Sequence, residues 1–112
     1  AIHLTLIPYL KAAGELKRSI YLAPYQAEAH LLLGRVHLRA GRLREAQEAC
    51  TISLWSQETA AAHALLGEVY LQGRNRAAAR VEAEKALALD PRSPDARALL
   101  GKLQPQQPPP SV

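Results

Sequence analysis

The chain has no methionine, a single cysteine and no long apolar run among its 112 residues. One thiol excludes an internal disulfide framework and any zinc cluster built from several cysteines. The lack of a long apolar run predicts a soluble chain with no membrane span. Without a methionine or the basic segment of a signal peptide at its start, we expect a processed product or part of a longer protein. Its compartment, cytoplasmic or periplasmic, would depend on what precedes residue 1.

A six-residue phrase occurs three times at a near-constant interval. It reads Ala-His-Leu-Leu-Leu-Gly at 29–34, Ala-His-Ala-Leu-Leu-Gly at 62–67 and Ala-Arg-Ala-Leu-Leu-Gly at 96–101, with closing glycines 33 and 34 residues apart. Such an interval is typical of arrays of one supersecondary unit, because a lone helical hairpin cannot bury its apolar face and stacks on copies of itself. The sequence therefore predicts an all-α array of helical hairpins.

Apolar residues recur every three or four positions within each interval, as an amphipathic helix requires. This pattern predicts helices over residues 27–40, 43–54, 60–72 and 76–89. Gly41 and Gly73 follow two of these helices, where glycine can adopt the left-handed conformation that ends a helix. Asn75 is expected to cap the next helix, and Ser-Pro-Asp at 93–95 predicts a further helix start.

The predicted organisation has five parts. They are a partial repeat at 1–24, whose first helix is missing, whole repeats at 27–59 and 60–92, a capping helix at 93–103, and a Pro/Gln-rich tail at 104–112. Arg97 and Lys102 make the capping helix polar, as expected where an array ends against solvent. The tail has no side chains for a core, so we expect a disordered segment in preference to a proline-rich ligand.

These features resemble the tetratricopeptide repeat family over residues 9–103. The resemblance rests on the Leu-Gly pairs at 33–34, 66–67 and 100–101, on Tyr70, on the small residues Ala46, Ala79, Ala83 and Ala86, and on Ala-Leu-Ala-Leu-Asp-Pro at 86–91. Small residues at such positions let neighbouring helices approach closely. The resemblance implies a right-handed superhelix of stacked hairpins, an α-solenoid.

Some positions depart from the family's pattern. His30 and His63 replace a large aromatic residue, His37 replaces a tyrosine, Gly73 stands one residue early in its turn, and the repeat at 27–59 is one residue short. We therefore expect an irregular joint at 55–59, with Trp55 either wedged into it or exposed at it.

Residues that carry enzymatic chemistry have no partners at useful spacing. His30, His37 and His63 replace residues that the family packs between helices, and no carboxylate or thiol accompanies them at ligand spacing. We expect buried imidazoles and no metal site. Cys50 takes the place of Ala83 in the next repeat, which predicts a packed thiol and not a nucleophile. No serine lies in a nucleophile-elbow context, so we expect neither an enzyme nor a cofactor.

The resemblance also implies a concave groove, lined by the first helix of each hairpin, on which a peptide or partner helix can lie. The carboxylate clamp of some family members does not fit, because no asparagine lies on these helices and Glu68 follows Arg35 one repeat later. We expect an apolar protein segment with some acidic character. The groove residues carried over are Glu28, Leu31, Arg35, Leu38, Arg39, Ala61, Ala64, Glu68, Leu71, Gln72, Asp95, Ala98 and Lys102.

Pairs of arginines follow the two turn glycines. Stacked hairpins are expected to align Arg42, Arg44, Arg74 and Arg76 as a basic edge. With 14 Lys and Arg against 10 Asp and Glu, such an edge suits an acidic protein, a phosphate backbone or an anionic membrane. No aromatic residues interleave for base stacking, which makes nucleic acid the less favoured partner.

Three functions remain open. The first is a protein-binding scaffold module within a larger chain or assembly, and the second is an RNA-binding helical repeat that uses the basic edge. The third is a structural element that contacts a larger subunit or itself, through the uncovered N-terminal helix or through Trp55.

Overall fold

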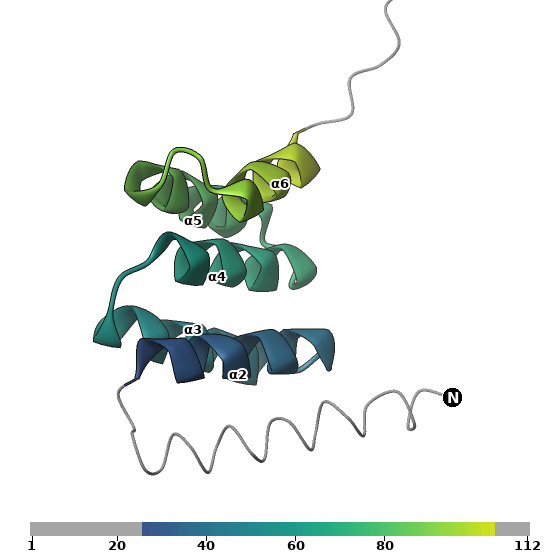
Figure 1. Ribbon diagram of the computed structural model, residues 1–112. Helices are drawn as coiled ribbons and strands as arrows, with labels where there is room; N and C mark the ends of the chain where they lie inside the picture. The colour runs from purple at the N-terminus through teal and green to yellow at the C-terminus, as the bar shows by residue number, and fades with distance from the viewer. Residues whose placement is uncertain (1–25, 105–112) are drawn as a thin grey trace, which may run out of the picture.

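A computed structural model describes residues 26–104, and over that range the chain is all-helical (Figure 1). No strand occurs among these residues. The helices are α2 (Ala27–Arg39), α3 (Leu43–Ser56), α4 (Ala60–Gln72), α5 (Arg76–Leu89) and α6 (Pro94–Leu103). The predicted partial repeat at 1–24, and the tail beyond residue 104, lie outside the described residues.

The predicted helix bounds agree closely with the structure. The predictions for 60–72 and 76–89 are confirmed to the residue, while α2 ends at Arg39 and α3 continues two residues past 54. This continuation places Trp55 in the last turn of α3 with 81% of its surface exposed. Of the two alternatives for Trp55, the exposed one is therefore confirmed. The joint that follows, residues 57–59, is non-helical, as expected.

Side-chain caps fix where three of the helices begin. The side-chain oxygens of Thr59, Asn75 and Ser93 each accept a hydrogen bond from the backbone amide three residues further on, at 3.1, 3.1 and 3.2 Å. Each bond satisfies one of the amides that have no partner in the first turn of a helix. The predicted caps at Asn75 and Ser93 are confirmed, and Thr59 is an additional one.

The two turns within the hairpins share one backbone path but not the same glycine. Gly41 has φ 78°, as predicted for a left-handed helix end. In the second turn Gly73 has φ −79° and Arg74 takes the left-handed conformation, with φ 65°. The expectation that Gly73 would end its helix in this conformation is wrong. Because Gly73 stands one residue early, Arg74 takes the position of Gly41, at a cost of roughly 1–2 kcal/mol for a residue with a Cβ.

The helices pack in pairs that stack on one another. Figure 1 shows α2 beside α3 and α4 beside α5, with α6 at the end of the stack. Helix α4 contacts α2 on one side and α6 on the other, whereas α3 and α5 do not touch each other. The first helices of the hairpins, α2, α4 and α6, therefore form one continuous layer of the described structure.

The triplicated phrase marks where this layer packs most closely. A Cβ added to Gly34 would lie 3.2 Å from Leu65 Cδ2, and one added to Gly67 would overlap Leu99 Cδ2. Leu65 and Leu99 occupy the same place in successive copies of the phrase, so each packs on the glycine of the copy before it. At Gly67 only a residue without a side chain permits this approach, while at Gly34 a Cβ would be tight against its neighbours. The equivalent residue of the first copy, Leu32, is 40% exposed.

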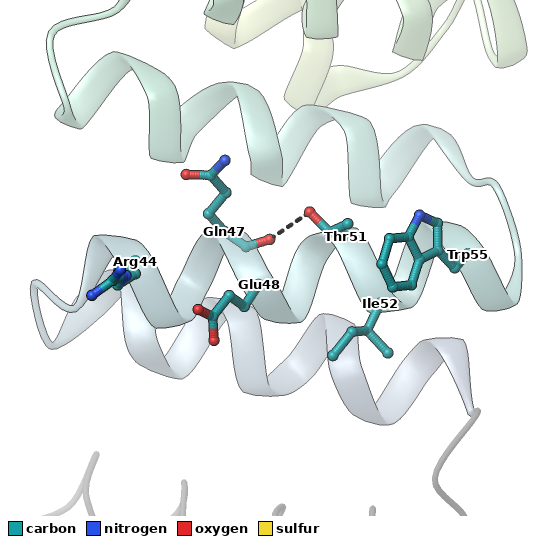
Figure 2. A pocket seen from close by; sticks show the side chains of 6 residues that line it. All are labelled: Arg44, Gln47, Glu48, Thr51, Ile52 and Trp55. Carbon is teal, nitrogen blue, oxygen red and sulfur yellow. Dashed lines mark hydrogen bonds between the residues drawn. The ribbon is translucent and has the colours of Figure 1, made fainter.

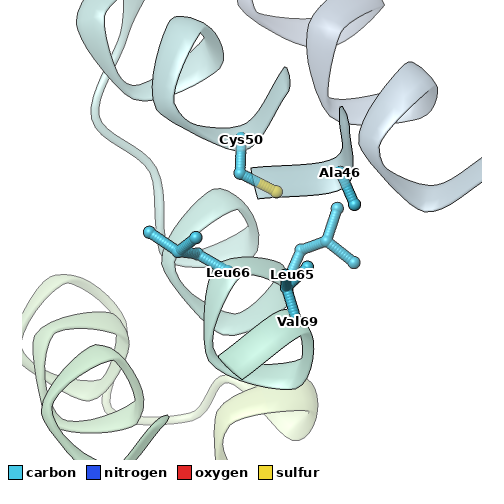
Figure 3. Packing of buried hydrophobic residues seen from close by; sticks show 5 residues of the cluster. All are labelled: Ala46, Cys50, Leu65, Leu66 and Val69. Atoms are coloured by element: carbon cyan, nitrogen blue, oxygen red, sulfur yellow. The ribbon is translucent and has the colours of Figure 1, made fainter. Parts of the chain in front are cut away.

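Small residues fill the space between the helices, both within a hairpin and where one hairpin packs on the next helix. Cys50 and the four alanines singled out in the sequence, Ala46, Ala79, Ala83 and Ala86, are all 0% exposed. Figure 3 shows Cys50 and Ala46 of α3 against Leu65, Leu66 and Val69 of α4. This arrangement confirms the predicted packing role of Cys50 and the alanines, because larger side chains would force the helices apart.

Candidate partner-binding site

The layer formed by α2, α4 and α6 carries a surface cavity of about 410 Å³. Of its six lining residues, five belong to the predicted groove, and Leu65 does not. Leu65 was not predicted as a groove residue. Its side chain is placed by Gly34 of the preceding hairpin, and this contact cannot be read from the neighbours of Leu65 in the sequence. The lining residues are Arg35, Leu38 and Arg39 of α2, Ala61 and Leu65 of α4, and Asp95 of α6.

Not all of the predicted groove residues are available to a partner. Ala64 is only 2% exposed and packs with Ala86 and Ala96 in the core. Leu31, Leu38 and Leu71 are half-buried against the hydrophobic clusters, so part of their apolar surface is already covered. The remaining surface of the layer is mostly polar. It includes the exposed residues Glu28, Gln72, Ala98 and Lys102.

The charges of the predicted groove are only partly compensated. Lys102 Nζ lies 2.9 Å from Glu68 Oε1, so the carboxylate expected to repel an acidic guest is paired. Arg35, Arg39 and Asp95 form no ion pair or side-chain hydrogen bond with other described residues. Within residues 26–104, the cavity therefore has two unpaired cations from α2 and one unpaired carboxylate at the start of α6.

The four arginines of the basic edge are all exposed, but one of them has a structural role. Arg76 Nη2 donates to the carbonyl oxygens of Leu103, at 2.8 Å, and Lys102, at 3.4 Å. These carbonyls end α6, where a cation is favourable. Of the four arginines, Arg42, Arg44 and Arg74 are then the ones without a side-chain partner among the described residues, which weakens the case for a phosphate-backbone ligand.

The three histidines of the described helices are buried, as expected. His63 Nδ1 lies 2.6 Å from Glu82 Oε2, and Nε2 lies 3.1 Å from Glu58 Oε2. No carboxylate was expected beside His63 at ligand spacing, and the folded chain brings two to its ring from outside α4. The contact between His63 and Glu82 has one sign in the sequence. Glu82 is a charged residue among the small residues by which α5 packs on its neighbours. The two carboxylates face opposite ring nitrogens, and residues 26–104 contain no group of three His, Cys, Asp or Glu that could hold a metal ion.

Burial raises the pKa of the Cys50 thiol to about 12, with a smaller contribution from Glu82 in the same direction and an opposing one from Arg35. Such a thiol stays protonated and is a poor nucleophile. The fully buried Cys50 therefore packs like the alanine of the next repeat.

This pKa predicts a loss of stability at alkaline pH. The unfolded thiol ionises near pH 8.5–9, before the folded one, so stability falls by up to about 1.4 kcal/mol per pH unit from there towards pH 12. Urea unfolding at pH of about 8 and 10.5 is expected to show an extra loss of about 2 kcal/mol relative to Cys50→Ala. Parallel pH profiles for the two proteins would contradict the assignment.

A second hollow, of about 430 Å³, lies along the outer face of α3 (Figure 2). Its lining residues follow one another at spacings of three and one, so they form a single stripe of the helix. We call it the α3 stripe. Two of its residues were named from the sequence, Arg44 in the basic edge and Trp55 as either wedged into the joint or exposed at it. Its residues are Arg44, Gln47, Glu48, Thr51, Ile52 and Trp55.

Within the described residues, no helix is both long and apolar enough to cross a membrane. No protein-family model matches the chain, and no curated protein is found similar to it.

Proposed function

We propose that the chain is a protein-binding module of the tetratricopeptide type. In this proposal α2–α5 are two stacked hairpins of a right-handed superhelix, α6 closes the stack, and the layer of first helices is a concave groove. The threefold phrase and the packing of Leu65 on Gly34 and of Leu99 on Gly67 support it. Stacking through a repeated contact of this kind is the property that defines a solenoid.

The cavity shared by α2, α4 and α6 is the observation that carries the proposal. Its lining combines the apolar Leu38, Ala61 and Leu65 with Arg35 and Arg39, which have no ion-pair partner among residues 26–104. An extended segment or a helix of a partner protein would place an apolar side chain against the apolar lining residues and a carboxylate against the arginines. Asp95, from α6, would favour a basic residue further along the guest.

Reversing the charge of the two α2 arginines tests this proposal. The double variant Arg35→Glu/Arg39→Glu is expected to weaken binding of a partner captured from native extract by about tenfold or more, or about 1.4 kcal/mol. The reason is that two cations facing a carboxylate become two like charges. Affinity would be measured by titrating the purified partner and following fluorescence anisotropy.

The matched control is Arg80→Glu/Arg92→Glu. It changes the net charge by the same amount at two exposed positions that do not line the cavity. Equal weakening by both double variants would mean that overall charge governs binding, and the groove would then be the wrong site. Capture of no protein at all would contradict the proposed function.

A further inference from the structure

The outer face of α3 differs from the same face of α5, although the two helices are equivalent in the repeat. Counting 33 residues along the chain, Arg44, Ile52 and Trp55 correspond to Ala77, Lys85 and Ala88. The face of α5 is therefore an ordinary solvated one. On α3 the same positions present a tryptophan that is 81% exposed, beside a hollow of about 430 Å³.

The charged and aromatic residues of the α3 stripe have no partners in the described structure. Arg44, Glu48 and Trp55 form no side-chain hydrogen bond or ion pair with residues 26–104. Exposed tryptophan and arginine are the residues most enriched among those that dominate binding energy at protein interfaces. The stripe itself contains one cation, Arg44, and one anion, Glu48, so it carries no net charge. The chain's net charge of +4 lies on other residues and does not oppose the association of two stripes.

We propose that the α3 stripe binds a second copy of this chain, with the two α3 helices antiparallel about a twofold axis between residues 49 and 50. The residues of the stripe are spaced symmetrically about that point, so each faces a different residue of the second copy. The facing pairs are Arg44 with Trp55, Gln47 with Ile52, and Glu48 with Thr51.

The chemistry of the stripe selects this orientation. Antiparallel packing sets each Arg44 guanidinium over the indole of Trp55, a favourable cation–π pair, and does so twice because of the symmetry. Parallel packing would place Arg44 against Arg44 and Glu48 against Glu48. A helix of 14 residues is about 21 Å long, so one helix pair buries less than the 1,200 Å² of a standard interface. The dimer is therefore reversible.

The dimer leaves the groove free. The cavity of the groove lies on α2, α4 and α6, and none of its lining residues belongs to the α3 stripe. Each dimer thus presents two copies of the layer formed by the first helices. A partner with two binding segments would gain from both at once, because the second contact becomes intramolecular.

Sedimentation equilibrium of the full chain, from about 5 to 500 µM, tests the dimer. We expect the mass to rise towards that of a dimer, and the emission of Trp55, the only tryptophan, to shift to shorter wavelength in parallel. Trp55→Ala and Arg44→Glu are expected to raise the dissociation constant at least tenfold. Val81→Ala, at the exposed α5 position equivalent to Glu48, should leave it unchanged. A monomer at every concentration would overturn the proposal. An unchanged dissociation constant for the Trp55→Ala variant would do the same.

Disulfide trapping tests the orientation. Glu48 and Thr51 face each other in the antiparallel dimer, so mixing the variants Glu48→Cys and Thr51→Cys should give mixed disulfides faster than either variant alone. The native Cys50 is 0% exposed and contributes little background. Faster cross-linking of Glu48→Cys with itself would show a parallel pair and overturn the proposed arrangement.

Discussion

Replacing Leu99 by alanine is expected to lower the free energy of unfolding by about 2–5 kcal/mol, measured by urea denaturation. Leu99 is 0% exposed and packs on Gly67 and against Ala79, Ala83 and Leu103. The substitution leaves a cavity where α6 meets the preceding hairpin. Since stacked units are stabilised mainly by their neighbours, amide exchange should rise in α6 more than in α2.

Leu32→Ala is the matched control, because Leu32 holds the same place in the first copy of the phrase. Leu32 is 40% exposed, so its truncation removes less buried surface and should cost less than about 1.5 kcal/mol. Equal losses for Leu32→Ala and Leu99→Ala would show that burial of this leucine on a preceding glycine does not stabilise the stack.

Replacing His63 by alanine is expected to destabilise the fold by about 3 kcal/mol, again measured by urea unfolding. His63 is 5% exposed and lies 2.6 Å from Glu82, whose side chain is itself 10% exposed. Truncation opens a cavity and leaves the Glu82 carboxylate largely desolvated. Among the described residues, the remaining charged partner of Glu82 would be Lys85, whose Nζ lies 3.6 Å from Glu82 Oε1.

Glu58→Ala serves as the control for this prediction. It removes the second carboxylate of His63, at 3.1 Å, but from a side chain that is 63% exposed. Because the Glu58 carboxylate lies largely in solvent, its contact with His63 contributes up to about 1 kcal/mol. If Glu58→Ala proved as costly as His63→Ala, the stabilisation would not come from the buried contact with Glu82.

Local signals in the sequence were enough to find the helices. The bounds 60–72 and 76–89, and the caps at Asn75 and Ser93, depend on residues that are neighbours along the chain. Helical periodicity and capping act over one or two turns, and no distant contact is needed to recognise them.

Predictions that depended on distant contacts succeeded less well. Ala64 was expected in the groove and is buried. Glu82 was not predicted to contact His63, yet the two side chains lie against each other. Arg76 was expected on a free basic edge and instead caps the end of α6. In each case the contact is made with a helix from another part of the chain. The residues next to it in the sequence do not indicate this contact.

For residues 26–104 the sequence by itself determined the all-helical structure, the helix bounds and the small residues at close helix contacts, because periodicity, capping and size are local properties. Only the tertiary structure decided which charges are paired and which remain open. Glu68 is paired with Lys102, whereas Arg35 and Arg39 line a cavity and have no ion-pair partner in the part of the chain that the structure describes. The α3 stripe likewise emerged only from the packed helix, because the hollow along it and the exposure of Trp55 are properties of the folded chain.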